Sequence, residues 1–412
     1  MATEHTKNIV IIGGGIIGCT TAYYLAHHPA YDPSTTKVTL LEASVRGIAQ
    51  GASGKAGGLC AKWAYPKELV DISFPEHERL AELHDGAKRW GWRYVECGSW
   101  EGRGEIVYPG SAKKSRSKTS REGFEELGPD WETKKRVQKG LPAELDWIKT
   151  ELTDSYSKMA ETGETAQVHP YLFSRSMIDL AREKGVQVVR GRATSIDIDE
   201  STKSVTGVKY TDNTTKTTQT LPATHVILAA GVWSPQILPK LPIIGTRAHS
   251  ITIQFDPPRT FPNHVLFTEI TLPSSRETSM RIASPEIYPR PSNEVYCCGP
   301  GDSPPIPDTV DDVTIEEGAC ESVFENVSSI SEVLREGKIG RRQACFLPVV
   351  STGGGPIIGD ASHVAKGLVI GTGHTCWGIS NAPGTAKALA ELVLEGTIKC
   401  ANLKKLEPAR FI

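Results

Sequence analysis

A glycine-rich run near the N-terminus has the spacing of a turn that binds a nucleotide phosphate. Residues 13–18, Gly-Gly-Gly-Ile-Ile-Gly, fit the pattern G-x-G-x-x-G. In that pattern the first glycine (Gly13) allows a tight turn, the second (Gly15) lets a pyrophosphate approach the backbone, and the third (Gly18) lets a helix and a strand pack closely. The pyrophosphate then lies at the positive N-terminus of the helix. The run predicts a phosphate-binding turn, with an ordinary glycine turn as the alternative.

The elements around this run complete a dinucleotide-binding unit. A β-branched strand at 8–12 precedes the turn, a helix over 16–28 follows it, and a second buried strand over 38–41 ends at Glu42. A carboxylate at that place can bind the ribose hydroxyls of adenosine, and it disfavours a 2′-phosphate. We therefore expect a dinucleotide site.

Three further motifs lie in segments that again show the alternation of strands and helices expected of a parallel α/β domain. They are GASGKAGG at 51–58, QACFLP at 343–348 and TGHTCWG at 372–378. With them the chain resembles the FAD-dependent D-amino-acid-oxidase-like superfamily, which includes glycine oxidase, sarcosine oxidase, D-amino-acid dehydrogenase and the fructosyl-amine oxidases. The likeness is greatest to a branch known from fungi and plants. It covers about 1–60, 165–235 and 340–395.

The resemblance implies FAD as the cofactor and assigns contacts with it by position. The implied positions are Gly13, Gly15, Ile16, Ile17, Gly18, Glu42, Ala43, Ser53, Gly54, Lys55, Ala56, Gly57, Val189, Ala230, Gly231, Trp233, Cys345, Gly373, His374, Thr375, Cys376, Trp377 and Gly378. The helix expected to start near Pro383 would direct its positive N-terminus at the flavin N1–C2=O edge.

The resemblance also implies a reaction, the oxidation of an amine C–N bond by hydride transfer to flavin N5. Amino-acid oxidases of the glycine-oxidase type hold the substrate carboxylate with an arginine, and the matching position here is Leu347. Leucine cannot pair with a carboxylate. Arg290 is our first candidate for a substitute, ahead of Arg341, Arg342 and Lys55, with a solvated surface arginine as the alternative.

Three residues have a functional and a structural interpretation side by side. Lys55 lies in a turn of small residues, where its ammonium would assist the reaction with O2 or bind an anionic group, or would simply face solvent. His374 would be a general base or would have a structural role in its turn. Cys345 matches the position at which sarcosine and fructosyl-amine oxidases attach FAD covalently. A buried, unreacted cysteine with non-covalent FAD is the favoured interpretation.

The chain is expected to fold as two domains of class α/β, α+β overall. A discontinuous Rossmann-like FAD/NAD(P)-binding domain would take residues 1–61, 165–235 and 340–412, and a β-rich substrate domain would take 62–164 and 236–339. Helical stretches are expected at 75–86, 142–150 and 170–184, and a β-hairpin at 195–199 and 205–210. The basic tract at 113–121 is either an exposed loop or a patch for an anionic partner.

Composition excludes several other classes of protein. The 412 residues contain 46 Lys and Arg and 48 Asp and Glu, so the formal net charge of −2 does not suit a nucleic-acid or membrane-surface binder. Nine scattered cysteines without a C-x-x-C pair indicate reduced thiols and no zinc site. No stretch has the length of a membrane span or a signal peptide, so a cytoplasmic protein is expected.

The expected function is therefore FAD-dependent oxidation of a small-molecule primary or secondary amine, or of an amino-acid derivative, with O2 as acceptor. Two alternatives stay open at this point. One is an amine dehydrogenase with a different electron acceptor, and the other is a regulatory protein in which FAD is structural. The sequence does not name the amine, because specificity lies in the two inserted segments.

Overall fold

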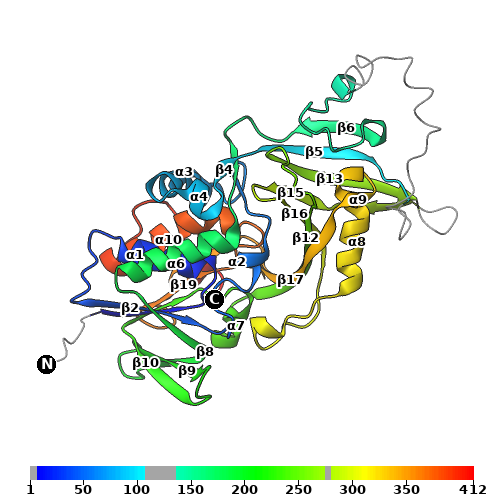
Figure 1. The fold of residues 1–412 in the computed structure, drawn as a ribbon. Coiled ribbons are helices and arrows are strands. Elements are labelled where there is room, and N and C mark those ends of the chain that lie inside the picture. The colour runs from blue at the N-terminus through cyan, green and yellow to red at the C-terminus, as the bar shows by residue number, and fades with distance from the viewer. Residues whose placement is uncertain (1–6, 107–135, 274–279) are drawn as a thin grey trace, which may run out of the picture.

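The apolar strands near the N-terminus form the centre of a large sheet in the computed structural model, which describes residues 7–106, 136–273 and 280–412 (Figure 1). This first sheet has the spatial order β10 (Thr218–Pro222), β9 (Val205–Asp212), β8 (Gln187–Ile198), β2 (Thr36–Glu42), β1 (Lys7–Ile12), β11 (His225–Leu228), β19 (Leu368–Thr372) and β18 (Ile357–Asp360). The five strands from β8 to β19 run parallel. Their carboxyl ends therefore meet at one edge, where ligands of open α/β sheets bind.

A layer of helices covers one face of the first sheet (Figure 1). It consists of α1 (Ile16–Ala26), α6 (Pro170–Glu183), α10 (Gly378–Glu395) and α3 (Lys67–Leu83), with the short α4 (Gly86–Trp90) beside α6. Apolar side chains of these helices and of β1 and β2 share one buried cluster, so burial of this face holds the layer in place.

A second, mainly antiparallel sheet lies beside the first. Its order is β17 (Lys338–Val350), β12 (Ile243–Gln254), β16 (Glu294–Asp302), β15 (Glu286–Arg290), β13 (His264–Pro273), β5 (Glu96–Arg103) and β6 (Thr153–Lys158), with β14 (Met280–Ala283) paired to β13. Helices α8 (Glu317–Ser328) and α9 (Glu332–Glu336) pack on one face of it. Its other face meets a small three-stranded sheet of β3 (Leu59–Ala61), β7 (Thr165–Gln167) and β4 (Arg93–Tyr94).

The expected fold class is confirmed, and the structure corrects several elements. The hairpin at 195–210 is present as β8 and β9, and the helix over 170–184 is present as α6. The prediction of a helix at 142–150 is wrong, because these residues form turns. Helix α3 begins at Lys67, well before Pro75, and α10 begins at Gly378 rather than near Pro383.

Two elements bear on the expected domain division, which stays a prediction. Strand β17 falls largely in the block assigned to the FAD domain, yet it pairs with β12 in the second sheet. Helix α3 falls in the block assigned to the substrate domain, yet it packs with α10. Both elements join the parts that the sequence analysis separates.

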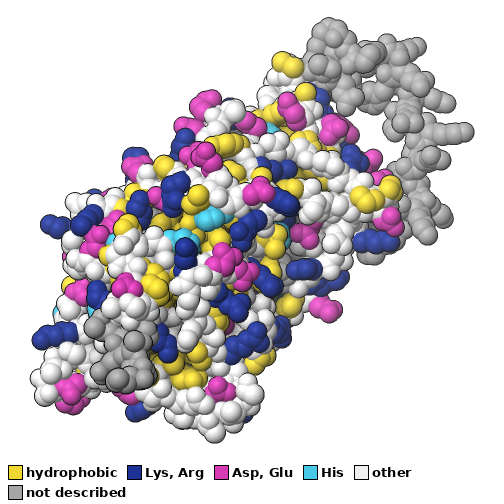
Figure 2. All heavy atoms as spheres, turned by 60° about the vertical axis from the view of Figure 1, so that its left-hand side comes forward, with side chains coloured by type: hydrophobic (Ala, Val, Ile, Leu, Met, Phe, Trp, Pro, Cys, Tyr) yellow, Lys and Arg dark blue, Asp and Glu magenta, His cyan; other side chains and the backbone are white. Residues whose placement is uncertain are grey.

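The surface shows charges of both signs mixed over the face seen in Figure 2. Among the described helices, none combines the length and the apolar character needed to cross a lipid bilayer. The basic tract at 113–121 lies outside the described residues.

Candidate functional site

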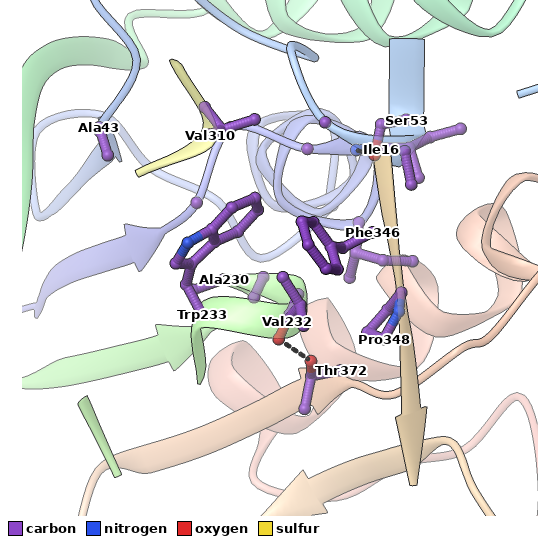
Figure 3. Close-up of a pocket in the computed structure, with 18 of the residues that line it drawn as sticks. Ile16, Ala43, Ser53, Ala230, Val232, Trp233, Val310, Phe346, Pro348 and Thr372 are labelled. Carbon is purple, nitrogen blue, oxygen red and sulfur yellow. Dashed lines mark hydrogen bonds between the residues drawn. The ribbon is translucent and has the colours of Figure 1, made fainter. Parts of the chain in front are cut away.

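A cavity of about 1270 Å³, its open mouth included, lies at the carboxyl edge of the parallel strands. Its walls come from the glycine turn before α1, from the ends of β2, β11 and β19, from the middle of β8, and from β17 of the second sheet. In the close-up of Figure 3, the rings of Trp233 and Phe346 face the cavity, with Ile16 and Ser53 above and Thr372 below. The site therefore lies between the two large sheets.

The glycine turn has the geometry expected of a phosphate-binding loop. Gly13 has a φ of +110°, and a Cβ there would lie 2.5 Å from the carbonyl oxygen of Ala229, so only glycine suits this position. A Cβ on Gly18 would overlap the carbonyl oxygen of Gly13, which accounts for the close packing of α1 on the turn. Gly13, Gly14 and Gly15 all line the cavity at the N-terminus of α1. Phosphates at this place would meet backbone N–H groups and the positive end of the helix.

Glu42 lies at the end of β2 and closes the turn by hydrogen bonds. Its carboxylate accepts from the backbone N–H groups of Gly14, at 2.7 Å, and Ser44, at 2.6 Å. Burial raises the pKa of Glu42 to about 7, and the negative charge of Asp311 contributes to this rise. The two hydrogen bonds lower this pKa but do not outweigh burial. The carboxylate also lines the cavity, as required for a contact with ribose.

A segment between β16 and α8 covers the end of the cavity at Glu42, and the sequence analysis did not anticipate this contact. Residues 308–310 line the wall, where Val310 lies above Trp233 (Figure 3). Asp311 accepts hydrogen bonds from Ser44 Oγ, at 2.7 Å, and from the backbone N–H of Val45, at 2.9 Å. Trp233 Nε1 donates to the carbonyl of Pro307 at 2.8 Å. We call residues 307–311 the strap.

Most of the implied FAD contacts line the cavity, and seven do not. The seven are Gly18, Gly54, Lys55, Gly57, Val189, Cys345 and Trp377. Val189 pairs with Leu41 inside the sheet, and Gly191 to Ala193, further along the same strand β8, line the wall in its place. Gly57 instead lies against Tyr288, whose ring would be 2.7 Å from a Cβ at that position.

The other end of the cavity is built from β17 and the turn before α10. Phe346, Leu347 and Pro348 form an apolar wall opposite residues 372–376, and the first turn of α10 borders the space at Gly378 and Ile379. Gly373, with a φ of +79°, makes the turn possible. Leu347 thus lies where the resemblance places a carboxylate-binding arginine, and the wall there is apolar. The helix N-terminus that faces the cavity is at Gly378, five residues before the expected start.

Arg290, the first candidate for a substitute, is held elsewhere. Its guanidinium forms an ion pair with Glu294 at 2.6 Å and donates to the carbonyl of Ala56 at 3.1 Å, and only 6% of the side chain is exposed. It lies over the ring of Tyr296, outside the cavity lining. Arg341 and Arg342 are exposed, and Arg342 pairs with Glu321. The structure therefore does not bring an arginine of this group to the site.

Replacing Arg290 with methionine is expected to lower the free energy of unfolding by about 3–5 kcal/mol, because it leaves the Glu294 carboxylate buried without its partner. Urea unfolding of the purified protein measures this change. The double variant Arg290→Met/Glu294→Met is expected to recover most of the loss. A single variant with unchanged stability but impaired substrate binding would contradict the structural assignment.

Lys55 and His374 are both constrained by neighbours. Lys55 Nζ donates to the carbonyl of Ala344 at 2.9 Å, and burial lowers its pKa. His374 lines the cavity, but its Nε2 is 3.0 Å from Thr385 Oγ1 on α10, and burial lowers its pKa to about 3. A neutral, hydrogen-bonded His374 fits the structural interpretation of this residue better than that of a general base.

Cys345 lies on β17 beside Lys55, with its side chain buried outside the cavity lining. Burial raises the pKa of this thiol to about 11, so it is protonated at neutral pH and a poor nucleophile. Acid precipitation of the purified protein is therefore expected to release the yellow colour into the supernatant. Colour retained in the pellet would contradict this and favour a thioether at Cys345.

Other lining residues were missed by the sequence analysis. They are Ile12, Gly14, Leu41, Ala49, Gln50, Gly51, Ala52, Gly191, Arg192, Ala193, Ala229, Val232, Gln236, Ile237, Asp308, Thr309, Val310, Phe346, Pro348, Gly371, Thr372 and Ile379. Many flank the predicted motifs and could have been found by extending them. The strap has no local signal, since only the fold brings it to Trp233.

The residues present fit FAD. The glycine turn leaves room where a Cβ would stand, Glu42 meets the ribose position, and the cavity continues from there to the small-residue turn at Gly373 and the N-terminus of α10. Gly13 to Ile17, Glu42 and Gly191 to Ala193 would hold the ADP half. Residues 346–348 and 373–376 would surround the flavin.

Comparison with known proteins agrees with this fit. The family described as FAD dependent oxidoreductase (DAO) matches residues 8–392. The chain is 34% identical to the Saccharomyces cerevisiae protein TDA3, named as an oxidoreductase, across 99% of this chain and 95% of that protein. It is 32% identical to the Schizosaccharomyces pombe protein C1F5.03c, across 98% of each.

Among solved structures, glycine oxidase from Geobacillus kaustophilus superposes with a TM-score of 0.71 at 16% identity, covering 99% of this chain and 100% of that one. This likeness supports the fold alone, because the identity is low. The family match and the two relatives extend over nearly the whole chain. The protein therefore belongs to the DAO family of FAD-dependent oxidoreductases.

Proposed function

We propose that the protein oxidises the C–N bond of an amine or amino-acid derivative and that O2 is the electron acceptor. The observation that carries the proposal is the enclosed wall at the flavin end of the cavity, where Phe346, Leu347 and Pro348 face the turn at 373–376. FAD, when bound, supplies the acceptor for the hydride that leaves the carbon next to the amine nitrogen. The similarity in fold to glycine oxidase supports an amine as the donor.

The chain's own residues would orient and shield this chemistry. The apolar wall of β17 would exclude water from the reacting carbon. The first turn of α10 directs the positive end of a helix at the cavity, which favours negative charge on a group bound there. Both roles need only the placement of backbone and apolar side chains.

Lys55 stays a hypothesis as a residue that assists the reaction with O2. Its half-buried ammonium reaches from the end of α2 (Ala52–Lys55) to β17, next to Cys345. A Lys55→Met variant is expected to react more slowly with O2 after reduction, measured by stopped-flow absorbance. Unchanged reduction and reoxidation rates would remove the role.

The proposal is tested by anaerobic mixing of the yellow holoprotein with a panel of amines and amino acids, while the visible flavin band is followed. Bleaching by one class, with recovery in air, is the expected result and identifies the substrate class. Bleaching without recovery would point to a dehydrogenase. A flavin that dithionite reduces but no amine bleaches would overturn the proposal and favour a structural FAD.

A further inference from the structure

A carboxylate lies on the face of the second sheet that points away from α8 and α9. Glu286 on β15 is directly opposite Phe267 of β13 and Cys298 of β16. Residues opposite one another share a face of the sheet, and so do residues two apart on one strand. Tyr288 therefore joins this row, and Tyr296 lies opposite Tyr288.

Glu286 is half-buried and lacks a cation among the described residues. Its Oε2 accepts hydrogen bonds from Tyr288 Oη, at 2.5 Å, and from Cys298 Sγ, at 3.6 Å. In the part of the chain that the structure describes, neither a Lys, Arg nor His side chain forms an ion pair with it, and Oε1 has no hydrogen-bond partner. Burial raises the pKa of Glu286 despite the two donors. A carboxylate in this setting is stabilised when a positive charge comes to it.

Aromatic rings surround the same place. Trp377 lies 5.2 Å from Trp63, Trp63 lies 6.2 Å from Phe267, and Phe267 lies 6.3 Å from Tyr288, all measured between ring centroids at steep angles. The rings pack edge to face in one cluster, and aromatic rings are groups that attract ammonium and alkylated ammonium ions.

Two observations relate the group to the cofactor cavity, one electrostatic and one a packing contact. Cys376 lines the cavity with an exposed side chain, and its pKa is raised by burial and also by the negative charge of Glu286. The Tyr288 ring packs on Gly57, next to Ala56 in the cavity wall. Glu286 thus lies on the second-sheet side of the wall that contains Cys376 and Ala56, without lining the cavity itself.

We propose that Glu286, with the rings of Trp63, Trp377, Phe267 and Tyr288, binds a cationic group of the substrate. The substrate class is then an amine that carries a second, positively charged ammonium or alkylammonium group where an α-amino acid carries its carboxylate. The apolar side chain of Leu347 agrees with this, because it has neither a charge nor a hydrogen-bond donor that could bind a substrate carboxylate. This inference rests on the proposed amine oxidation for the reacting nitrogen, but the cation site itself can be tested without turnover.

The test titrates tetramethylammonium chloride into the holoprotein and follows tryptophan fluorescence and the flavin difference spectrum. Saturable binding is expected for wild type, with affinity at least tenfold lower in Glu286→Gln. Glu336→Gln, an exposed glutamate at the end of α9 on the opposite side of the sheet, is the matched control and is expected to bind as wild type does. Equal binding by wild type and Glu286→Gln would overturn the proposal.

Sodium acetate and tert-butanol serve as anionic and neutral probes on wild type, so the proposal stays testable if Glu286→Gln does not fold. Binding of acetate, or of tert-butanol as tightly as the cation, would overturn it. Anaerobic bleaching by 1,4-diaminobutane is expected to slow at least tenfold in Glu286→Gln. Binding of the cation without bleaching by any amine would support the cation site and contradict the proposed reaction. Equal bleaching by glycine in wild type and Glu286→Gln would support the proposed reaction and contradict the cation site.

Discussion

Replacing Gly15 with valine is expected to yield a folded protein that purifies almost without FAD. Gly15 precedes α1 with φ −76° and ψ −176°, an extended conformation that valine also adopts, so the backbone tolerates the change. The new side chain would stand in the cavity, with its Cβ 3.0 Å from Ser53 Oγ, where the pyrophosphate must approach. We expect FAD affinity to fall at least about 100-fold, equivalent to roughly 2.7 kcal/mol.

The measurement is the ratio of flavin to protein absorbance after purification, followed by titration of the apoprotein with FAD. Gly318→Val is the matched control, since a Cβ at Gly318 near the start of α8 meets open space. Full FAD content in Gly15→Val would mean that the phosphates do not lie at this turn.

The second large effect is a loss of FAD affinity as the pH falls below 7. In the apoprotein, burial raises the pKa of Glu42 to about 7, so the carboxyl takes up a proton in this range. Ribose hydroxyls donate to the ionised form, and binding therefore has to expel that proton. The affinity is expected to fall up to about tenfold per pH unit below 7 and to be constant above it.

Fluorescence titration of the apoprotein with FAD at several pH values measures this dependence. Glu42→Gln is expected to bind FAD more weakly, with no pH dependence in this range, and Glu336→Gln to match wild type. An affinity that is level from about pH 5.5 to 8 in wild type would refute the linkage. The same raised pKa predicts the opposite trend for the stability of the apoprotein. The folded state holds the Glu42 proton more tightly than the unfolded chain does, so the free energy of unfolding is expected to rise as the pH falls from 7 toward 4.5.

The parts of the site that were predictable are those in which the local backbone dictates the residue type. Gly13 needs its positive φ and Gly18 has no room for a Cβ, so the turn could be identified from spacing alone. Glu42 followed from its place at the end of β2. The start of α10 was misjudged because Pro383 was treated as a first-turn residue. Inside the helix, proline cannot bond the Ile379 carbonyl, and His77 Nε2 lies 2.9 Å from that oxygen instead.

The parts that could not be predicted depend on contacts between distant segments. The strap reaches Ser44 and Trp233 only in the folded chain. The contact of Arg290 with the Ala56 carbonyl joins β15 to the turn after α2, and the sequence does not specify that approach. The row of Glu286, Phe267 and Cys298 joins three strands whose register the sequence does not specify.

The order of strands along the chain also determines when the cofactor can be acquired during synthesis. The first sheet is begun by β1 and β2, but its inner strand β19 and the cavity turn at 373–376 come after every strand of the second sheet. A chain growing from its N-terminus exposes the glycine turn long before the opposite wall exists. FAD loading therefore has to follow synthesis of the turn at 373–376, and the cofactor cannot stabilise the nascent chain before that point.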